Sequence, residues 1–112
     1  MNEEQFIPFH TTDLAGTRVL VLAPHPDDET IGCGGTLALH AAAGDPVRVL
    51  ILTNGEKGDV FGRFDRNAYI AIRQQETRSA CASLGISDVM FWPYEDHSIR
   101  IIAQQRILSR QL

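Results

Sequence analysis

Three apolar runs alternate with two longer helical segments along the chain. The runs are residues 18–23, 47–53 and 88–92. They are apolar at nearly every position, which is typical of strands buried on both faces of a parallel sheet. Residues 30–43 and 66–84 have helical composition, and a glycine follows each of them, Gly44 and Gly85. The alternation predicts an α/β fold with right-handed crossovers between parallel strands.

Prolines mark two of the strand ends. Pro24 ends the first run, and Pro93 is expected to cut the third. Residues 1–16 form a segment that leads into the first strand, and residues 99–112 have helical composition with loosely spaced apolar positions. We find no internal repeat and no low-complexity linker, so the pattern indicates a single domain over residues 1–112.

The most informative polar stretch follows the first strand. Two prolines bracket His25, and three acids come next, Asp27-Asp28-Glu29. Adjacent acids repel one another and pack poorly, but a cation would stabilise them. The prolines stiffen the loop, so that His25 and Asp28, three residues apart, can converge on one ion. Imidazole and carboxylate ligands suit zinc or another divalent metal, and Asp27 would then be free to handle protons.

Simpler interpretations of this stretch stay open. Pro-Asp-Asp is an ordinary turn composition, and acids are favoured at a helix N-terminus. The position at the carboxyl end of a buried strand, where open α/β sheets bind ligands, favours the ion. A dinucleotide loop is disfavoured, because the third glycine of that fingerprint would fall at Leu37 and the neighbouring acids would repel a pyrophosphate.

The same residues resemble a known family. Residues 24–29, Pro-His-Pro-Asp-Asp-Glu, followed by Gly32-Cys33-Gly34-Gly35, are similar to the signature of the PIG-L/LmbE-like deacetylases. These are metal-dependent enzymes that remove acetyl groups from N-acetylglucosamine-type substrates. The similarity continues through Thr53-Asn54-Gly55-Glu56, Arg73 with Glu76, Leu84-Gly85-Ile86 and Asp96.

The resemblance implies a role for each matching residue. His25 and Asp28 would be ligands of Zn²⁺ or another divalent metal, and Asp27 would be the general base in hydrolysis of an acetamide. Arg73 and Asp96 would bind the substrate, an N-acetylated sugar or glycoconjugate. From the residues alone, Arg73 and Glu76 are equally well explained as a structural salt bridge on one helix face.

The resemblance also implies a Rossmann-like three-layer sandwich with a mostly parallel sheet. Family members are longer and complete the metal site with a downstream His-x-x-His element, a spacing that this sequence does not contain. The 112 residues are therefore expected to be the N-terminal portion of such a domain, truncated after about three strands. Whether the chain alone is active stays open, because two protein ligands hold zinc more weakly than three.

Composition narrows the possible partners. The net charge is −4 and no cluster of Lys and Arg occurs, which argues against nucleic acid. Neither a targeting segment nor an apolar stretch of membrane-spanning length is found. Cys33 and Cys81 give no disulfide framework, so a cytoplasmic location is expected. An exposed sheet edge would favour a homo-oligomer.

Two other functions remain as alternatives to the deacetylase. The first is a non-catalytic Rossmann-like module that binds a nucleotide or a sugar phosphate, which would take up no stoichiometric zinc. The second is a relic fragment whose acidic loop has lost its role. Glu56 could support the metal site or contact the substrate, and a solvated loop acid is at least as good an interpretation. For His97 an ordinary loop histidine is the simpler interpretation, and substitution for a metal ligand is the alternative.

Overall fold

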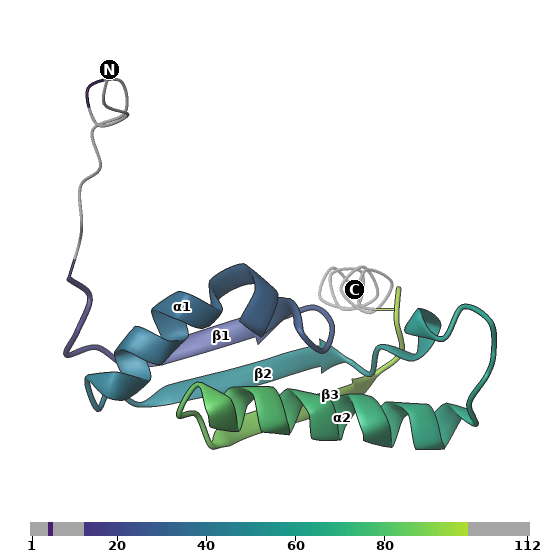
Figure 1. The fold of residues 1–112 in the computed structure, drawn as a ribbon. Helices are drawn as coiled ribbons and strands as arrows, with labels where there is room; N and C mark the ends of the chain where they lie inside the picture. The colour runs from purple at the N-terminus through teal and green to yellow at the C-terminus, as the bar shows by residue number, and fades with distance from the viewer. Residues whose placement is uncertain (1–4, 6–12, 99–112) are drawn as a thin grey trace, which may run out of the picture.

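The computed structural model describes residue 5 and residues 13–98, and it confirms the predicted alternation of strands and helices (Figure 1). The elements are β1 (Val19–Ala23), α1 (Asp28–Ala42), β2 (Val47–Thr53), the short 3₁₀ helix η2 (Glu56–Gly58), α2 (Arg66–Ser83) and β3 (Asp88–Tyr94). The helix expected at residues 99–112 lies outside the described residues. None of the described helices is long and apolar enough to span a membrane.

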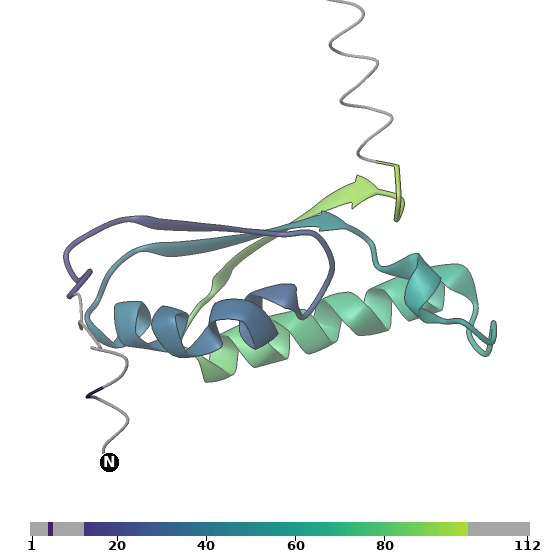
Figure 2. The same ribbon diagram turned by 90° about the horizontal axis from the view of Figure 1, so that it is seen from above.

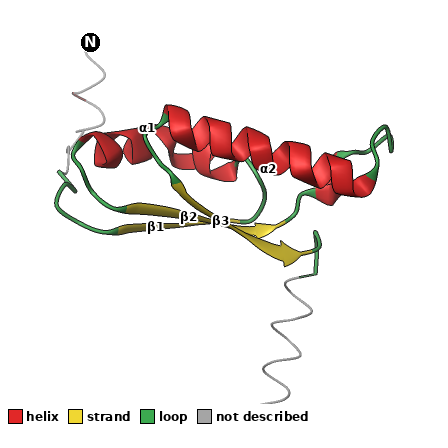
Figure 3. Ribbon diagram, turned by 90° about the horizontal axis from the view of Figure 1, so that it is seen from below, coloured by secondary structure: helices red, strands yellow, loops and turns green. Residues whose placement is uncertain are grey.

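The strands form a parallel sheet in the order β1-β2-β3. Both helices cover the same face of this sheet (Figures 2 and 3). Two successive right-handed crossovers in one direction place their helices on one side, which explains this arrangement. The described residues thus supply two of the three expected layers.

The core lies between the helices and the sheet. Its buried apolar residues are Ala23, Leu37, Val47, Val49, Ile51, Cys81 and Ile86. In the central strand β2, Leu50 on the opposite face is also buried. In β1 the pattern alternates, and Leu20 and Leu22 are 61% and 58% exposed. On the outer face of β2, Leu50 is buried, Arg48 is exposed and Leu52 is half-buried, so the predicted burial on both faces holds only at Leu50. β1 and β3 expose their outer faces within the described part of the chain.

Two boundaries differ from the sequence prediction. Helix α1 begins at Asp28 rather than at residue 30, because Asp27 adopts a left-handed φ of 85° and its carbonyl oxygen accepts the N–H groups of Thr30 and Ile31. Strand β3 continues through Pro93 to Tyr94. Pro93 is tolerated because β3 pairs only with β2 among the described strands and its register shifts between Ile51 and Thr53.

Candidate functional site

The carboxyl ends of the three strands meet at one edge of the sheet, and hydrogen bonds fasten the loops that follow them. The backbone N–H and the hydroxyl of Thr53 both donate to the carbonyl oxygen of Pro24, at 3.1 and 2.7 Å. The N–H of Asn54 donates to the carbonyl oxygen of Tyr94 at 2.9 Å. The loops after β1 and β3 are thereby both held against the end of β2.

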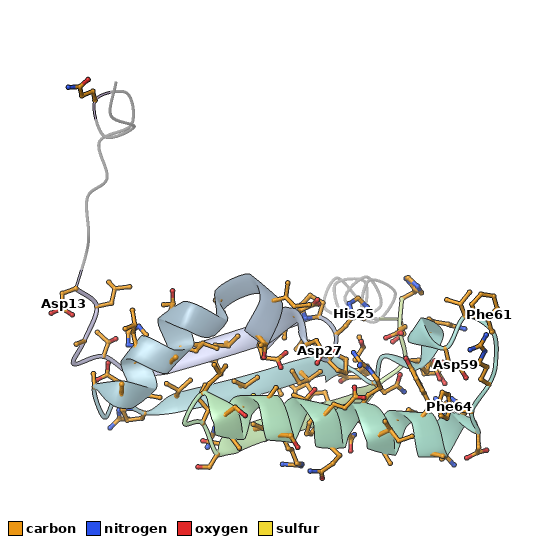
Figure 4. All side chains as sticks on the ribbon, in the orientation of Figure 1. Asp13, His25, Asp27, Asp59, Phe61 and Phe64 are labelled. Atoms are coloured by element: carbon orange, nitrogen blue, oxygen red, sulfur yellow. The ribbon has the colours of Figure 1, made fainter. Side chains whose placement is uncertain are left out.

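A cavity of about 250 Å³ lies among these loops and the first turns of α2. Its lining residues are His25, Pro26, Gly55, Lys57, Gly58, Tyr69, Arg73, Asp96 and His97. Figure 4 shows His25 and Asp27 near the carboxyl ends of the strands, and Asp59, Phe61 and Phe64 on the loop beyond them. The cavity thus brings together three of the predicted site residues, His25, Arg73 and Asp96.

His25 and Asp28 converge as their spacing predicts. The Nδ1 atom of His25 lies 3.4 Å from Oδ2 of Asp28, and the same oxygen accepts the backbone N–H of His25 at 3.1 Å. Both side chains are about half exposed. A nitrogen and an oxygen donor are therefore adjacent and accessible from solvent.

Asp27 points away from this pair. As the N-cap residue of α1 it makes no side-chain capping bond, and its Oδ2 atom instead lies 2.5 Å from Nη2 of Arg73. Arg73 Nη2 also donates to the carbonyl oxygen of Pro26 at 3.3 Å. The carboxylate of Asp27 is thus held in position from the neighbouring helix α2.

Arg73 makes two ion pairs. Its Nη1 atom contacts Oε2 of Glu76 at 2.5 Å, so the salt bridge on the helix face exists alongside the contact with Asp27. Partial burial works against the charged guanidinium, but Asp27 and Glu76 outweigh it and raise the pKa of Arg73. Arg73 is therefore a fixed positive charge in the cavity wall.

Asp96 is a buried acid in the cavity wall. Its carboxylate accepts the N–H groups of Gly55 and Lys57 at 3.1 and 2.9 Å, and its side chain is 3% exposed. Its Oδ1 atom lies 3.8 Å from Nε2 of His25. Burial alone would raise the pKa of Asp96, but the hydrogen bonds that its carboxylate accepts and the nearby His25 together lower it.

Glu29, the third acid of the motif, lies in the interior rather than in the cavity. It is 1% exposed, its Oε2 atom has no hydrogen-bond partner, and burial raises its pKa. Burial and the nearby Glu29 also raise the pKa of Cys81 to about 11. Cys81 is therefore a protonated core thiol, and it is no candidate for a nucleophile.

Sequence reasoning missed Tyr69 and Lys57, which both line the cavity. Tyr69 precedes Arg73 by four residues, about one helical turn. This spacing places both side chains on the same helix face, so it could have indicated that Tyr69 lies near Arg73. Lys57 carries no such signal, because its place depends on η2 and on the bond from its N–H to Asp96. Glu56 pairs with Arg66, and its side chain is 10% exposed, so it differs from the solvated loop acid that was one interpretation of it.

The donor set fits a divalent metal in part. His25 and Asp28 supply an imidazole nitrogen and a carboxylate oxygen, the ligand types that zinc accepts. A group of three or more such residues is not found among residues 13–98. The described chain thus offers two ligands of a site that ordinarily needs three or four.

A larger hollow of about 810 Å³ lies at the opposite edge of the sheet, around the amino ends of the strands. Three of the four charged side chains that line it are already paired: Arg48 with Asp88, and Asp45 with His40. Ligands of open α/β sheets bind at the carboxyl ends of the strands, so we take the smaller cavity as the candidate site.

The chain is similar to several curated proteins. It is 41% identical over 78 residues to 1D-myo-inositol 2-acetamido-2-deoxy-alpha-D-glucopyranoside deacetylase of Kineococcus radiotolerans, covering 66% of this chain and 22% of that protein. It is 36% identical over 84 residues to a probable N-acetyl-alpha-D-glucosaminyl L-malate deacetylase 2 of Bacillus cereus, covering 72% and 38%. The chain thus spans between about a fifth and two fifths of the length of these relatives.

Solved structures share the fold. N,N'-diacetylchitobiose deacetylase from Pyrococcus horikoshii superimposes with a TM-score of 0.67 and 32% identity, over 70% of this chain and 30% of that one. GalB, the 4-carboxy-2-hydroxymuconate hydratase from Pseudomonas putida KT2440, gives 0.63 and 27%, over 72% and 35%. The model of the PIG-L family, described as GlcNAc-PI de-N-acetylase, matches residues 20–111, and the chain therefore belongs to the PIG-L family.

Proposed function

We propose that the protein is a metal-dependent hydrolase that removes the acetyl group from an N-acetylglucosamine-type substrate. The observation that carries the proposal is that the two aspartates of the loop after β1 make different contacts. His25 and Asp28 lie side by side as potential ligands, while Asp27 is turned away and held by Arg73. The relatives that are named deacetylases, at 32 to 41% identity, support this reaction.

His25 and Asp28 would hold Zn²⁺ or another divalent metal, with the remaining ligands supplied by residues outside this sequence. When bound, such an ion lowers the pKa of a water molecule and polarises a carbonyl group. The loop is suited to this role, because its flanking prolines and the bonds from Thr53 to Pro24 limit its movement. Little conformational entropy would then be lost on binding.

Asp27 would act as the general base. Arg73 contacts Oδ2 of Asp27, which leaves Oδ1 to accept a proton from the water that attacks the acetamide carbonyl. The C–N bond then breaks to give acetate and the free amine of the sugar. Protonation of that amine requires an acid, which we place outside this sequence.

Arg73 and the cavity beside it would receive the substrate. Polyhydroxyl groups suit the donor fork of a guanidinium, and Tyr69 and Lys57 add further polar groups to the same wall. The substrate is thus an N-acetylated sugar or glycoconjugate. Asp96 remains a predicted substrate contact on the family resemblance, although its side chain is almost completely buried.

A hydratase is the second candidate, because GalB has the same fold at 27% identity. Hydration and amide hydrolysis both add water to a polarised carbon, so a metal and a base would serve either reaction. The relatives named deacetylases have higher identity, and they favour hydrolysis.

A cytoplasmic location is supported by the two free cysteines, Cys33 and Cys81.

Zinc titration by calorimetry tests the metal site. The protein with its downstream sequence included is expected to take up one zinc ion in a saturable manner, because residues 1–112 supply two of the ligands. His25→Ala and Asp28→Ala should abolish that uptake. Asp27→Asn should retain it, because Asp27 faces Arg73. His97→Ala is the matched control, since His97 lines the same cavity. Equal binding by the extended protein and by its His25→Ala variant would contradict the assignment, and so would an extended protein that binds no zinc, as the binding-module alternative predicts.

Release of free amine from N-acetylglucosamine glycosides tests the reaction. Asp27→Asn should lower turnover by at least about 100-fold with zinc uptake preserved, because proton transfer by a positioned base contributes about 10²- to 10⁴-fold. The assay is best run on the protein with its downstream sequence included. Unchanged turnover in Asp27→Asn would reject its role as the base.

A further inference from the structure

We infer that residues 59–64 form a binding platform for a second ring of the substrate, a sugar or cyclitol linked to the N-acetylated sugar. The inference rests on the proposed function, because it takes the neighbouring cavity to hold the N-acetylated sugar itself. It names the class of group on the other side of the glycosidic bond, and it gives a role to a loop that the hydrolysis does not use.

The loop of residues 59–64 is part of the rim of the cavity. It runs from η2 to the N-cap residue of α2, and Figure 4 shows Phe61 on its outer part. Gly58 and Tyr69, on either side of the loop, both line the cavity, and a Cβ atom at Gly58 would lie 2.7 Å from the hydroxyl oxygen of Tyr69. The two ends of the loop are thus close together, and its middle extends outward from the cavity wall.

The cavity is too small to enclose a large substrate. Its volume is about 250 Å³, whereas sites for drug-sized ligands measure roughly 300–1,000 Å³. A second ring joined to the bound sugar therefore extends beyond the cavity. Residues 59–64 present exposed aromatic side chains there, because Phe61 and Phe64 are 81% and 51% exposed.

The loop has a fixed shape that does not depend on Phe61. The carboxylate of Asp59 accepts the N–H groups of Arg63 and Phe64 at 3.0 Å each, and its carbonyl oxygen accepts the N–H of Gly62 at 3.1 Å. Phe64 directly precedes the N-cap residue of α2, and its ring centroid lies 5.7 Å from that of Tyr69, as in a hydrophobic staple. Little conformational entropy would therefore be lost when the loop binds a ligand.

The exposed part of the loop combines an aromatic face with hydrogen-bond donors. The guanidinium carbon of Arg63 lies 5.1 Å from the centroid of the Phe61 ring, and the rest of that ring is open to solvent. A sugar or cyclitol ring has apolar C–H groups on its faces and hydroxyl groups at its edge. The aromatic face suits the former and the guanidinium fork suits the latter, whereas a purely apolar group would use Phe61 alone.

The test uses the protein with its downstream sequence included and three glycosides of N-acetylglucosamine that share one anomeric linkage. Their second groups are methyl, octyl and a glucose ring, and kcat/KM is measured by release of the free amine. The wild type should prefer the substrate with the glucose ring. Phe61→Ala should lower kcat/KM for that substrate by about 3- to 10-fold, the range expected for loss of one contact with an aromatic face. The methyl glycoside should be unaffected.

Val60→Ala is the matched control. Val60 is 80% exposed on the same loop and has no ring, so this variant should keep the wild-type kcat/KM for all three substrates. Phe61→Tyr should keep them as well, because it retains the aromatic face. Arg63→Ala should lower kcat/KM for the substrate with the glucose ring and leave the octyl glycoside unchanged. Equal losses on these two substrates in Phe61→Ala would reject the inference, because the contact would then be a general apolar one.

A binding measurement makes the inference independent of turnover. Saturation-transfer difference NMR is recorded on the disaccharide in the presence of Asp27→Asn, which should not consume it. Protons of the second ring should receive saturation from the protein, and adding Phe61→Ala to the same variant should remove it. A second ring that receives no saturation in Asp27→Asn would overturn the inference.

The outcomes distinguish this inference from the proposed function. If none of the glycosides is deacetylated, the proposed function fails, while saturation transfer still decides whether the second ring contacts Phe61. If Phe61→Ala deacetylates all three as the wild type does, the platform is rejected and the hydrolase stands. A fall in unfolding temperature in Phe61→Ala as large as in Leu37→Ala, a 2% exposed residue, would also reject it, because Phe61 would then belong to the core of the longer protein.

Discussion

Gly55 lies where the loop after β2 packs against Pro26, in the loop that carries His25. Its φ is +70°, and a Cβ atom there would lie 3.0 Å from Cδ and 3.2 Å from Cγ of Pro26. We therefore expect Gly55→Ala to lower the free energy of unfolding by about 1–3 kcal/mol, because it adds backbone strain and a clash with the loop that carries His25. Urea unfolding followed by circular dichroism measures this.

Gly62→Ala separates the two contributions. Gly62 also has a positive φ, +60°, but a Cβ atom there would have no neighbour within 4 Å. Gly62→Ala should therefore lower the free energy of unfolding through backbone strain alone, by about 1–2 kcal/mol. If both variants lost the same stability, the contact between Gly55 and Pro26 would not matter. Zinc uptake should fall in Gly55→Ala only.

At the residue scale, the sequence predicts contacts within one loop better than contacts between loops. His25 and Asp28 are three residues apart, and the two prolines made their convergence predictable. Arg73 and Asp27 are 46 positions apart, and the family resemblance placed Arg73 at the site without indicating that it holds Asp27. Asp96 is buried against the loop after β2, where it accepts the N–H groups of Gly55 and Lys57, 41 and 39 positions away, so no local pattern could reveal this contact.

At the scale of elements, the end of α1 is fixed to the start of β1 by a buried polar contact. Nδ1 of His40 lies 2.8 Å from Oδ2 of Asp45, and the other oxygen of Asp45 accepts the N–H of Gly16 at 2.9 Å. The hydrogen bond from His40 is the main cause that lowers the pKa of Asp45 below its ordinary value of 3.8. The ionised form of Asp45 therefore stabilises the fold.

We accordingly expect Asp45→Asn to be less stable than the wild type at pH 7. A group with a lowered pKa stabilises the fold above its ordinary pKa, and this stabilisation is lost as the pH falls through the lowered value. The difference between variant and wild type should thus shrink below pH 3.8. Urea unfolding at neutral and acidic pH checks this.

Asp88→Asn is a suitable control for Asp45. Asp88 pairs with Arg48 at 2.8 Å, but both side chains are about half exposed. A surface pair of this kind contributes about 0–1 kcal/mol, so its removal should have little effect at either pH. A pH-independent loss in Asp45→Asn would show that packing, and not the charge, makes Asp45 important.

Helix and strand limits show where sequence patterns suffice. The continuous apolar run predicted β2 at residues 47–53 correctly, because this central strand pairs on both sides and buries five of its seven residues. The start of α1 was placed two residues late, since the left-handed turn at Asp27 has no sequence signal as strong as a glycine. The end of β3 was placed before Pro93, because edge position and register shift are properties of the whole sheet.

At the scale of the whole molecule, the outer face of the sheet is apolar. Leu22, Leu50 and Met90 are in register across β1, β2 and β3, and Trp92 lies two residues beyond Met90 on the same side of β3. Leu22, Met90 and Trp92 are 58%, 45% and 43% exposed. Neither α1 nor α2 covers this face (Figure 3), which is the face where the three-layer prediction expects further helices.

Two leucines on opposite faces test whether this outer face is open in solution. Leu37→Ala removes a side chain that is 2% exposed and should lower the free energy of unfolding by about 2–5 kcal/mol. Leu22→Ala should lower it by less than about 1 kcal/mol, because little buried area is lost.

Quenching of Trp92, the single tryptophan, by acrylamide reports exposure of the same face independently. A loss in Leu22→Ala as large as in Leu37→Ala would show that the face is covered. Dependence of that loss on protein concentration would then identify a second copy of the chain as the cover, as the predicted homo-oligomer requires, and independence of concentration would contradict that cover.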